Sequence, residues 1–479
     1  MIRMQKSEVF FQLLLITLVS ILGLLLVINN KEFIYLFILL FTVVAFYFTF
    51  NKKLILFEGF SLFSFYYFTL LIPAIYLYVS NFEKSVFINY TTFSQPLDEL
   101  FLWSLIYYIL GYIFAYFGFK LFKKDETVSI DLHNDGVSKK VLNIIIIAFS
   151  IIGLLNFIYN IIFFSGGNLF DYITNVSVRA LMFNEEGGTQ AGYLFAYMAA
   201  YMWLYRILKY HTKYRLFLLY LIITILMKAT TGRIFGTILY IFSFVSIFYF
   251  INIQIQSKKH LKYFGYFGLM FLFGVLFYFF RITSSLAYNN MLTTDWIGTI
   301  IEFINIDYLM YYAVDKGNTP NIALFMKIID SWANDVGYLY GESLFTWIYS
   351  LFPRSIRPED YQISAMASNI WYSHVPSNVQ GGNLPPTGIG EMYVNFGILG
   401  PFLGMFIFGS IVAFFYNLLL KFNNFWYLVM YVNISLGFFM IYAKGEFDNF
   451  SLWFIIPPLM TYLLLTFLTK LSRKKTNAN

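Results

Sequence analysis

Long apolar runs, separated by short polar segments, dominate the pattern of hydrophobic and polar positions along the 479-residue chain. An α-helix needs about 20 apolar residues to cross a bilayer, and most of these runs approach that length. The pattern therefore predicts an all-α polytopic membrane protein with about 12 transmembrane helices. The predicted spans cover residues 10–28, 32–50, 54–79, 99–120, 141–164, 190–208, 216–231, 234–256, 263–281, 396–420, 425–443 and 450–469.

One interval between apolar runs is much longer than the others. Residues 282–395 contain no convincing span, and a structureless loop of this length is unusual, so a small helical cap is expected. Two segments within it, NIALFMKIIDSWANDV (321–336) and GYLYGESLFTWIYSLF (337–352), predict amphipathic, partly membrane-facing helices. The expected division is a bundle of nine spans over 1–281, the cap, and three spans with a tail over 396–479.

Composition agrees with a membrane protein and excludes the other broad classes. The chain is 59% hydrophobic and only 12% charged, which lies far outside the range of soluble domains. Membrane-spanning barrels need short segments of alternating polarity, and these are absent. The first apolar run follows a basic start, and no small-residue cleavage site comes after it. We therefore expect a retained first helix and not a cleaved signal peptide.

The distribution of charge predicts an orientation. Most of the 32 Lys and Arg residues fall on one side of the predicted spans if the N-terminus is cytoplasmic, as the positive-inside rule requires. Both termini are then cytoplasmic, and the long loop lies on the outer face. The same asymmetry accounts for the net charge of +7, so no nucleic-acid partner is expected.

Several kinds of chemistry have no support in the sequence. The chain contains no cysteine, which excludes disulfides and thiol catalysis. It also contains no Asp-x-Asp pair, no HExxH, no phosphate-binding P-loop and no GxSxG. No metal site and no cofactor are therefore expected.

The strongest candidates for chemistry are two arginines of the long loop. Arg354 and Arg357 lie in FPRSIRP, where prolines fix the backbone of a non-helical turn. A guanidinium grips a phosphate or carboxylate at two points, so this turn is expected to hold a diphosphate at the membrane surface. The alternative is that the two arginines pair with Glu359 and Asp360 beside them.

Three further basic residues lie at predicted outer helix ends. Arg233 follows a Thr-Thr-Gly turn and opens the next helix, where free N–H groups also attract anions. Arg281 ends the ninth predicted span, and Lys444 begins KGEFDN after the eleventh. Each of the three also fits the alternative role of an interfacial anchor.

Two residues are candidates for proton transfer. His374 is the histidine predicted on the outer side, where it could accept a proton or donate a hydrogen bond to phosphate. Glu391, in PPTGIGEMY, is the carboxylate nearest a glycine-rich turn and a candidate general base. An exposed histidine without a function, and a helix-capping glutamate, are the alternatives.

In combination, these features resemble the O-antigen and oligosaccharide repeat-unit polymerases of the Wzy type. The resemblance covers the layout of the whole chain and the order of its motifs in the second half. Those motifs are TTGRIF between spans, YLYGESLF followed by FPRSIRP, LPPTGIGEMYVNFGILGP, and KGEF near the end. One departure is Lys444, where the family pattern suggests an arginine before the glycine.

The resemblance implies a GT-C-like fold in the bacterial inner membrane and a specific reaction. A glycan on undecaprenyl diphosphate is the donor, and a repeat unit on a second undecaprenyl diphosphate is the acceptor. The implied partners are these oligosaccharides, membrane lipid, a chain-length regulator and a flippase of the same pathway. The implied catalytic or diphosphate-binding residues are Arg233, Arg281, Arg354, Arg357, His374, Glu391 and Lys444.

Three other functions remain open from the sequence. A flippase for lipid-linked oligosaccharides is expected to carry more polar groups within its spans, shorter loops and internal repeats. An O-antigen ligase would use the same donor, so the physics of the donor site does not separate it from a polymerase. A membrane protein with a purely structural role is the third.

Overall fold

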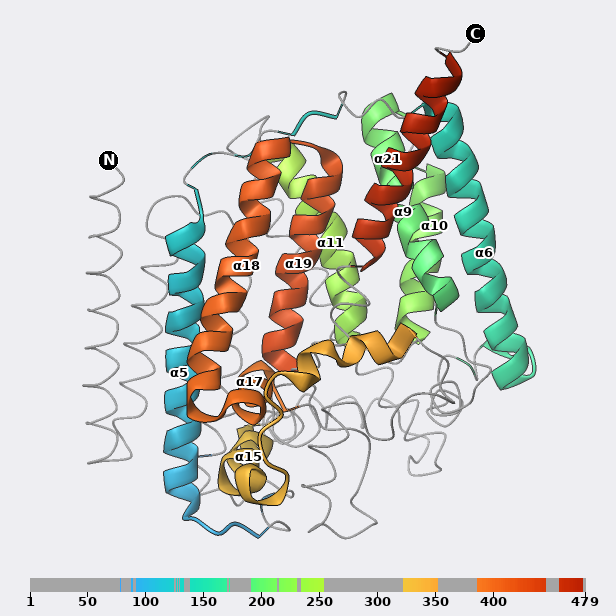
Figure 1. The fold of residues 1–479 in the computed structure, drawn as a ribbon. Helices are drawn as coiled ribbons and strands as arrows, with labels where there is room; N and C mark the ends of the chain where they lie inside the picture. Colours follow the sequence, from blue (N-terminus) through green and yellow to red (C-terminus); the bar gives the residue numbers. More distant parts are fainter. Residues whose placement is uncertain are drawn as a thin grey trace. The chain divides into compact units, whose positions relative to one another are not determined.

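The structure is a computed structural model, and it describes the chain in separate stretches (Figure 1). Most helices of the described residues lie where a helix or span is predicted, and the extended pairing there is a single bridge between Asp131 and Asn424. The described residues are 92–124, 138–169, 191–212, 215–230, 234–253, 322–351, 386–444 and 456–476, with residues 78, 88, 126, 128, 130–132 and 172 between them.

The long helices coincide with predicted spans. Within the described part, three stretches are long and apolar enough to cross a membrane, namely Leu97–Phe122, Lys139–Ser165 and Gly388–Phe422. The helices that match predicted spans are α5 (Leu97–Phe122), α6 (Lys139–Ser165), α9 (Ala191–Tyr210), α10 (Arg215–Thr230), α11 (Ile234–Ile253), α18 (Gly400–Phe422), α19 (Phe425–Lys444) and α21 (Ile456–Thr476). The spans predicted at 10–28, 32–50, 54–79 and 263–281 lie outside the described residues.

The chain divides into two compact units. The first contains α5, most of α18, the second half of α19, and the helices of the predicted cap. The second contains α6, α9, α10, α11, α21 and the first half of α19. The boundaries predicted at 281 and 395 are not tested, because residues 254–321 and 352–385 lie outside the described part of the chain.

In the first unit, α5 and α18 cross at very short range (Figure 1). A Cβ atom on Gly118 of α5 would overlap the carbonyl oxygen of Phe406, and one on Gly409 of α18 would overlap that of Ala115. Without a strong hydrophobic force between helices in lipid, small residues that let backbones approach are a main source of packing energy. These two glycines therefore fix the distance between α5 and α18.

The two helices predicted within residues 282–395 are confirmed as helices, and one detail of the prediction differs. The predicted segments form α15 (Ile322–Asp335) and the 3₁₀ helix η3 (Glu342–Leu351). The apolar side of α15 does not face a membrane, because Leu324, Phe325 and Trp332 are buried inside the unit. The ring of Phe325 packs edge-on against the ring of Tyr108 of α5.

A short helix leads from the long predicted loop into α18. Thr387, with a φ of 69°, caps α17 (Gly388–Phe396) by accepting a hydrogen bond from the Gly390 amide. Gly397, with a φ of 62°, ends this helix, and the turn η5 (Gly397–Leu399) precedes α18. A positive φ favours glycine, which explains why the helix predicted to start at 396 begins as a separate element at Gly400.

The second unit is organised around a line of tyrosines on one side of α9. Tyr193, Tyr197, Tyr201 and Tyr205 recur every four residues, so they share one face of the helix, and all are buried. The Tyr201 hydroxyl contacts Ser243 of α11 at 2.7 Å and donates to Asn433 of α19 at 3.1 Å. Such bonds between helices join three spans without requiring water.

Candidate active site

The structure describes one predicted site residue in full. Glu391 lies in the first turn of α17 and is fully buried. Lys444 is the last residue of α19, and its side chain is not described. The other predicted site residues lie outside the described residues, and they are Arg233, Arg281, Arg354, Arg357 and His374.

Glu391 forms the centre of a buried polar network. The Ser343 hydroxyl of η3 donates to Glu391 Oε1 at 2.9 Å. The Asn395 amide donates to Ser343 Oγ at 2.7 Å and to the Glu391 backbone carbonyl at 2.6 Å. A buried carboxylate is costly unless hydrogen bonds compensate it, so Ser343 and Asn395 are part of what keeps Glu391 inside the protein.

The same helix also holds the backbone that leads to η3. The amides of Leu339 and Tyr340 donate to the carbonyls of Val394 and Asn395, each at 3.0 Å. The Gly341 amide donates to Asn395 Oδ1 at 2.9 Å. The last turn of α17 therefore fixes residues 339–343 through main-chain bonds as well as through side chains.

The start of α17 explains why a carboxylate fits at position 391. The Glu391 amide donates to the Thr387 carbonyl at 2.8 Å, which places Glu391 in the first helical turn. Free N–H groups and the helix dipole stabilise a negative charge there. Gly390 leaves room for Phe325, because a Cβ on Gly390 would lie 3.3 Å from that ring.

The arrangement favours a positioning role for Glu391. A general base has to reach a substrate proton, whereas the described contacts of this side chain lie inside the protein. Leu351, where η3 ends, is three residues before Arg354. Glu391 thus helps to fix the helix that precedes Arg354 in the sequence.

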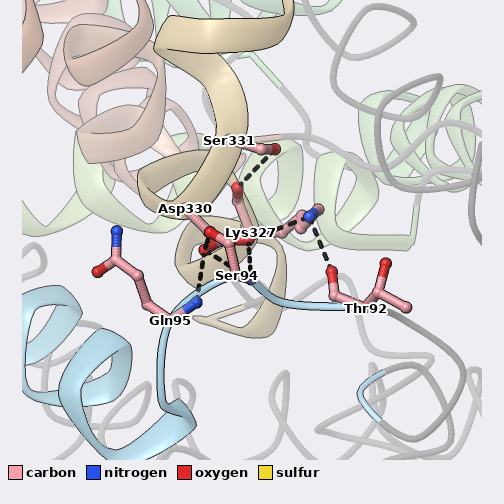
Figure 2. Close-up of polar contacts among 6 residues, drawn as sticks. All are labelled: Thr92, Ser94, Gln95, Lys327, Asp330 and Ser331. Carbon is pink, nitrogen blue, oxygen red and sulfur yellow. Dashed lines mark hydrogen bonds and ion pairs between the residues drawn. The ribbon is translucent and has the colours of Figure 1, made fainter.

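A second polar network fastens α15 to the segment that precedes α5 (Figure 2). Asp330 accepts hydrogen bonds from the Ser94 amide at 3.1 Å, the Ser94 hydroxyl, and the Gln95 amide at 3.2 Å. Lys327 Nζ lies 3.1 Å from Asp330 Oδ2 and donates to the Thr92 carbonyl at 2.9 Å. Two chain segments that are more than two hundred residues apart are joined in this way.

These contacts also set the protonation of Asp330. Burial raises the pKa of its carboxyl group, but hydrogen bonds from Ser94 and the nearby Lys327 ammonium outweigh burial and lower the pKa below its ordinary value. The carboxylate is therefore ionised at neutral pH, and the Lys327–Asp330 pair is a charged one. A buried pair of this kind needs its additional hydrogen bonds to be stable, and Ser94, Gln95 and Thr92 supply them.

Sequence reasoning missed the partners that define both networks. The Lys327–Asp330 spacing on a helix was a visible signal, because residues three apart face each other. Ser343 and Asn395 gave no such signal, because their contact joins residues 52 positions apart. Within the described residues, no group of three His, Asp or Glu side chains is placed to hold a metal ion.

Comparison with known proteins identifies the family. A family model described as O-antigen polysaccharide polymerase Wzy matches residues 8–476. This chain belongs to the Wzy family. The match spans both compact units, and it includes α17 and η3 with the network around Glu391. No curated protein and no solved structure matches the chain.

Membership of the Wzy family and the apolar helices make this an integral membrane protein of surface-polysaccharide synthesis. Wzy proteins polymerise O-antigen repeat units, so this chain is a polymerase of the glycosyltransferase kind. The sequence-based recognition is thus confirmed.

Proposed function

We propose that this Wzy-family protein extends a glycan on undecaprenyl diphosphate at the outer face of the bacterial inner membrane. A hydroxyl oxygen of the lipid-linked acceptor forms a bond to the reducing-end carbon of the donor glycan. The bond between that carbon and the diphosphate breaks, undecaprenyl diphosphate leaves with the electron pair, and the hydroxyl proton passes to a base. The family match over residues 8–476 is the observation that carries this proposal.

The proposed site consists of arginines that neutralise the departing diphosphate. Negative charge builds on the leaving group in the transition state, and preorganised donors stabilise it without a metal ion. Arg354 and Arg357 are the central residues, with Arg233, Arg281 and Lys444 as further cations and His374 as a proton carrier. The rigid attachment of η3 to α17 supports this assignment, because a fixed helix precedes the arginine turn.

Two sets of contacts support the predicted assignment of loops to common sides of the membrane, within the proposed layout of about 12 spans and cytoplasmic termini. On the predicted outer side, Asp330 of the long loop meets Ser94, which belongs to another predicted outer loop. On the predicted inner side, the Asp131 amide donates to the Asn423 carbonyl at 2.7 Å, and both lie in predicted cytoplasmic segments. Segments predicted on the same side of the membrane therefore meet within each unit.

Cysteine labelling tests the orientation directly, since the native chain has no cysteine. Ser377→Cys and Asn383→Cys should react with a membrane-impermeant thiol reagent in intact spheroplasts. Asp131→Cys should react only after lysis, because residue 131 is predicted on the same, cytoplasmic side of the membrane as most of the basic loops. The reversed pattern would place the arginine turn in the cytoplasm and remove the proposed site from the substrate.

Reconstitution tests the reaction. Purified protein in proteoliposomes with lipid-linked repeat units should produce longer lipid-linked glycans and free undecaprenyl diphosphate. Excess EDTA should leave the rate unchanged, because arginines stabilise the leaving group in this proposal. Activity that is lost in EDTA and restored by Mg²⁺ or Mn²⁺ would contradict the metal-free mechanism. Elongation only with lipid A core as the acceptor would show a ligase, and transport without elongation would show a flippase.

Variants of Glu391 separate positioning from general-base catalysis. Glu391→Gln keeps an oxygen that can accept from Ser343, so elongation should fall by no more than about tenfold, whereas loss of a general base costs about 10²–10⁴-fold. Glu391→Ala and Ser343→Ala remove the same contact. The double variant should therefore be hardly slower than Glu391→Ala, since effects within one network are not additive. A slow Glu391→Gln beside a normal Ser343→Ala would restore the general-base assignment.

A further inference from the structure

Among the described side chains of η3, two apolar ones are exposed while two hydroxyl groups are buried. Phe345 is 62% exposed and Ile348 is 40% exposed, whereas Ser343 and Thr346 are only 3% and 4% exposed. In a 3₁₀ helix, side chains three residues apart lie directly above one another. Glu342, Phe345 and Ile348 therefore form one outward stripe, and Ser343 and Thr346 form an inward one. A helix in contact with water would be expected to show the opposite arrangement.

The inward stripe is stable because its hydroxyl groups have partners. Ser343 donates to Glu391, and Thr346 donates to the Ser343 carbonyl at 2.8 Å. Burial of these hydroxyls therefore carries little penalty. The network around Glu391 thus determines which side of η3 faces outward, and that side is apolar after Glu342.

The outward stripe adjoins a surface that belongs to a membrane span. A Cβ on Gly341, just before η3, would lie 3.3 Å from the Phe396 ring, which is itself exposed. After Phe396, exposed apolar residues continue along α18, which lies in the candidate span Gly388–Phe422. They are Ile398, Leu399, Leu403, Ile407, Ile411 and Phe414. Exposed apolar residues of α18 therefore lead up to Phe396, which lies against the turn before η3.

We infer that η3 lies in the outer interface of the bilayer, with Phe345 and Ile348 among the lipids. Figure 1 shows η3 at a steep angle to α18, as expected of a helix that lies along the membrane surface. Tyr340, which is highly exposed, precedes this stripe, and tyrosine is enriched at membrane interfaces. The exposed Glu342 then lies at the depth of the polar headgroups. By contrast, α15 ends in the exposed polar residues Asn334 and Asp335, which suit water.

This placement has a consequence that rests on the proposed function. Arg354 follows the last residue of η3 by three positions in the sequence, so the chain leaves η3 toward the two arginines at the depth of the headgroups. The diphosphate of a polyprenyl-linked glycan lies at the same depth, because its chain is in the hydrocarbon and its sugars are in water. Membrane contact of η3 would thus bring the arginines to the diphosphate without extracting the lipid.

Fluorescence from single cysteines tests the membrane contact. Phe345→Cys and Ile348→Cys, labelled with an environment-sensitive fluorophore, are compared in proteoliposomes of phosphatidylethanolamine and phosphatidylglycerol. Nitroxide-labelled lipids should quench both labels, with a shallow nitroxide more effective than a deep one, and iodide should quench them weakly. Asn334→Cys is the control for water, and Leu403→Cys of α18 is the control for lipid. Tyr340→Cys provides a further position if either variant is poorly folded.

Two results would overturn the inference. Iodide quenching at 345 and 348 as strong as at 334 would place η3 in water. Protection from both iodide and nitroxide lipids would show that protein covers the stripe, either another part of this chain or a second copy. The measurement needs no substrate and no activity, so it can fail while the polymerase proposal holds, and the reverse is also true.

Discussion

Replacing Arg354 or Arg357 by lysine is expected to stop polymerisation while the protein remains inserted at normal abundance. Lysine keeps the positive charge but loses the planar fork that binds two phosphate oxygens. Loss of one transition-state hydrogen-bond donor costs about 2.7–4 kcal/mol, or about a hundred- to a thousandfold in rate. At least one of the two variants should leave cells with lipopolysaccharide that carries at most one repeat unit. Arg233→Lys should behave similarly.

The competing interpretation predicts almost no effect. An exposed ion pair of either arginine with Glu359 or Asp360 would contribute about 0–1 kcal/mol, so its loss would hardly change the rate. Arg215→Lys is a matched control, because Arg215 is an exposed arginine at the start of α10. Gel analysis of lipopolysaccharide and immunoblots of membranes give the two readouts. Normal long chains in the alanine and lysine variants at both 354 and 357 would show that the turn is structural.

The second large effect concerns the crossing of α5 and α18. Gly409→Leu and Gly118→Leu should each prevent the two helices from approaching, because the added side chain would overlap the backbone carbonyl of Ala115 or Phe406. Overpacking costs about 1–3 kcal/mol even where side chains can move, and a backbone carbonyl cannot move away easily. We therefore expect at least about 3 kcal/mol of destabilisation and strongly reduced amounts of folded protein in membranes.

The thermal midpoint in detergent measures this effect. It is obtained by size-exclusion chromatography of a fluorescent fusion after heating. Ile407→Leu is the control, because Ile407 is an exposed residue of the same helix and the change conserves volume. It should leave the midpoint within about 2 °C of the native protein. A Gly409→Leu variant with a midpoint equally close to native would show that the two helices do not cross at this point.

The spans could be predicted from the sequence because a bilayer imposes a length and a composition on each helix. The span expected at 99–120 was found as α5, and the one expected at 141–164 as α6. The break between α17 and α18 was less visible. It depends on the backbone conformation of Gly397, and the apolar run continues through it.

The polar networks could not be predicted, because they join residues far apart in the chain. Glu391 was equally consistent with a base and with a structural residue until its contact with Ser343, 48 positions away, was known. Asp330 could have been expected to pair with Lys327, but its contacts with Ser94 and Gln95 depend on the tertiary fold. The arginine turn was predicted from residue type and rigidity, and it stays a prediction.

The link between Asp330 and Ser94 has a consequence for biosynthesis. The ribosome makes the segment before α5 early, yet the carboxylate that accepts its amides follows 236 residues later. Until then, the Ser94 and Gln95 amides before α5 lack this acceptor. The first compact unit is therefore completed only after most of the chain has been inserted, and nascent chains that end before residue 330 should be recognised as immature by membrane proteases.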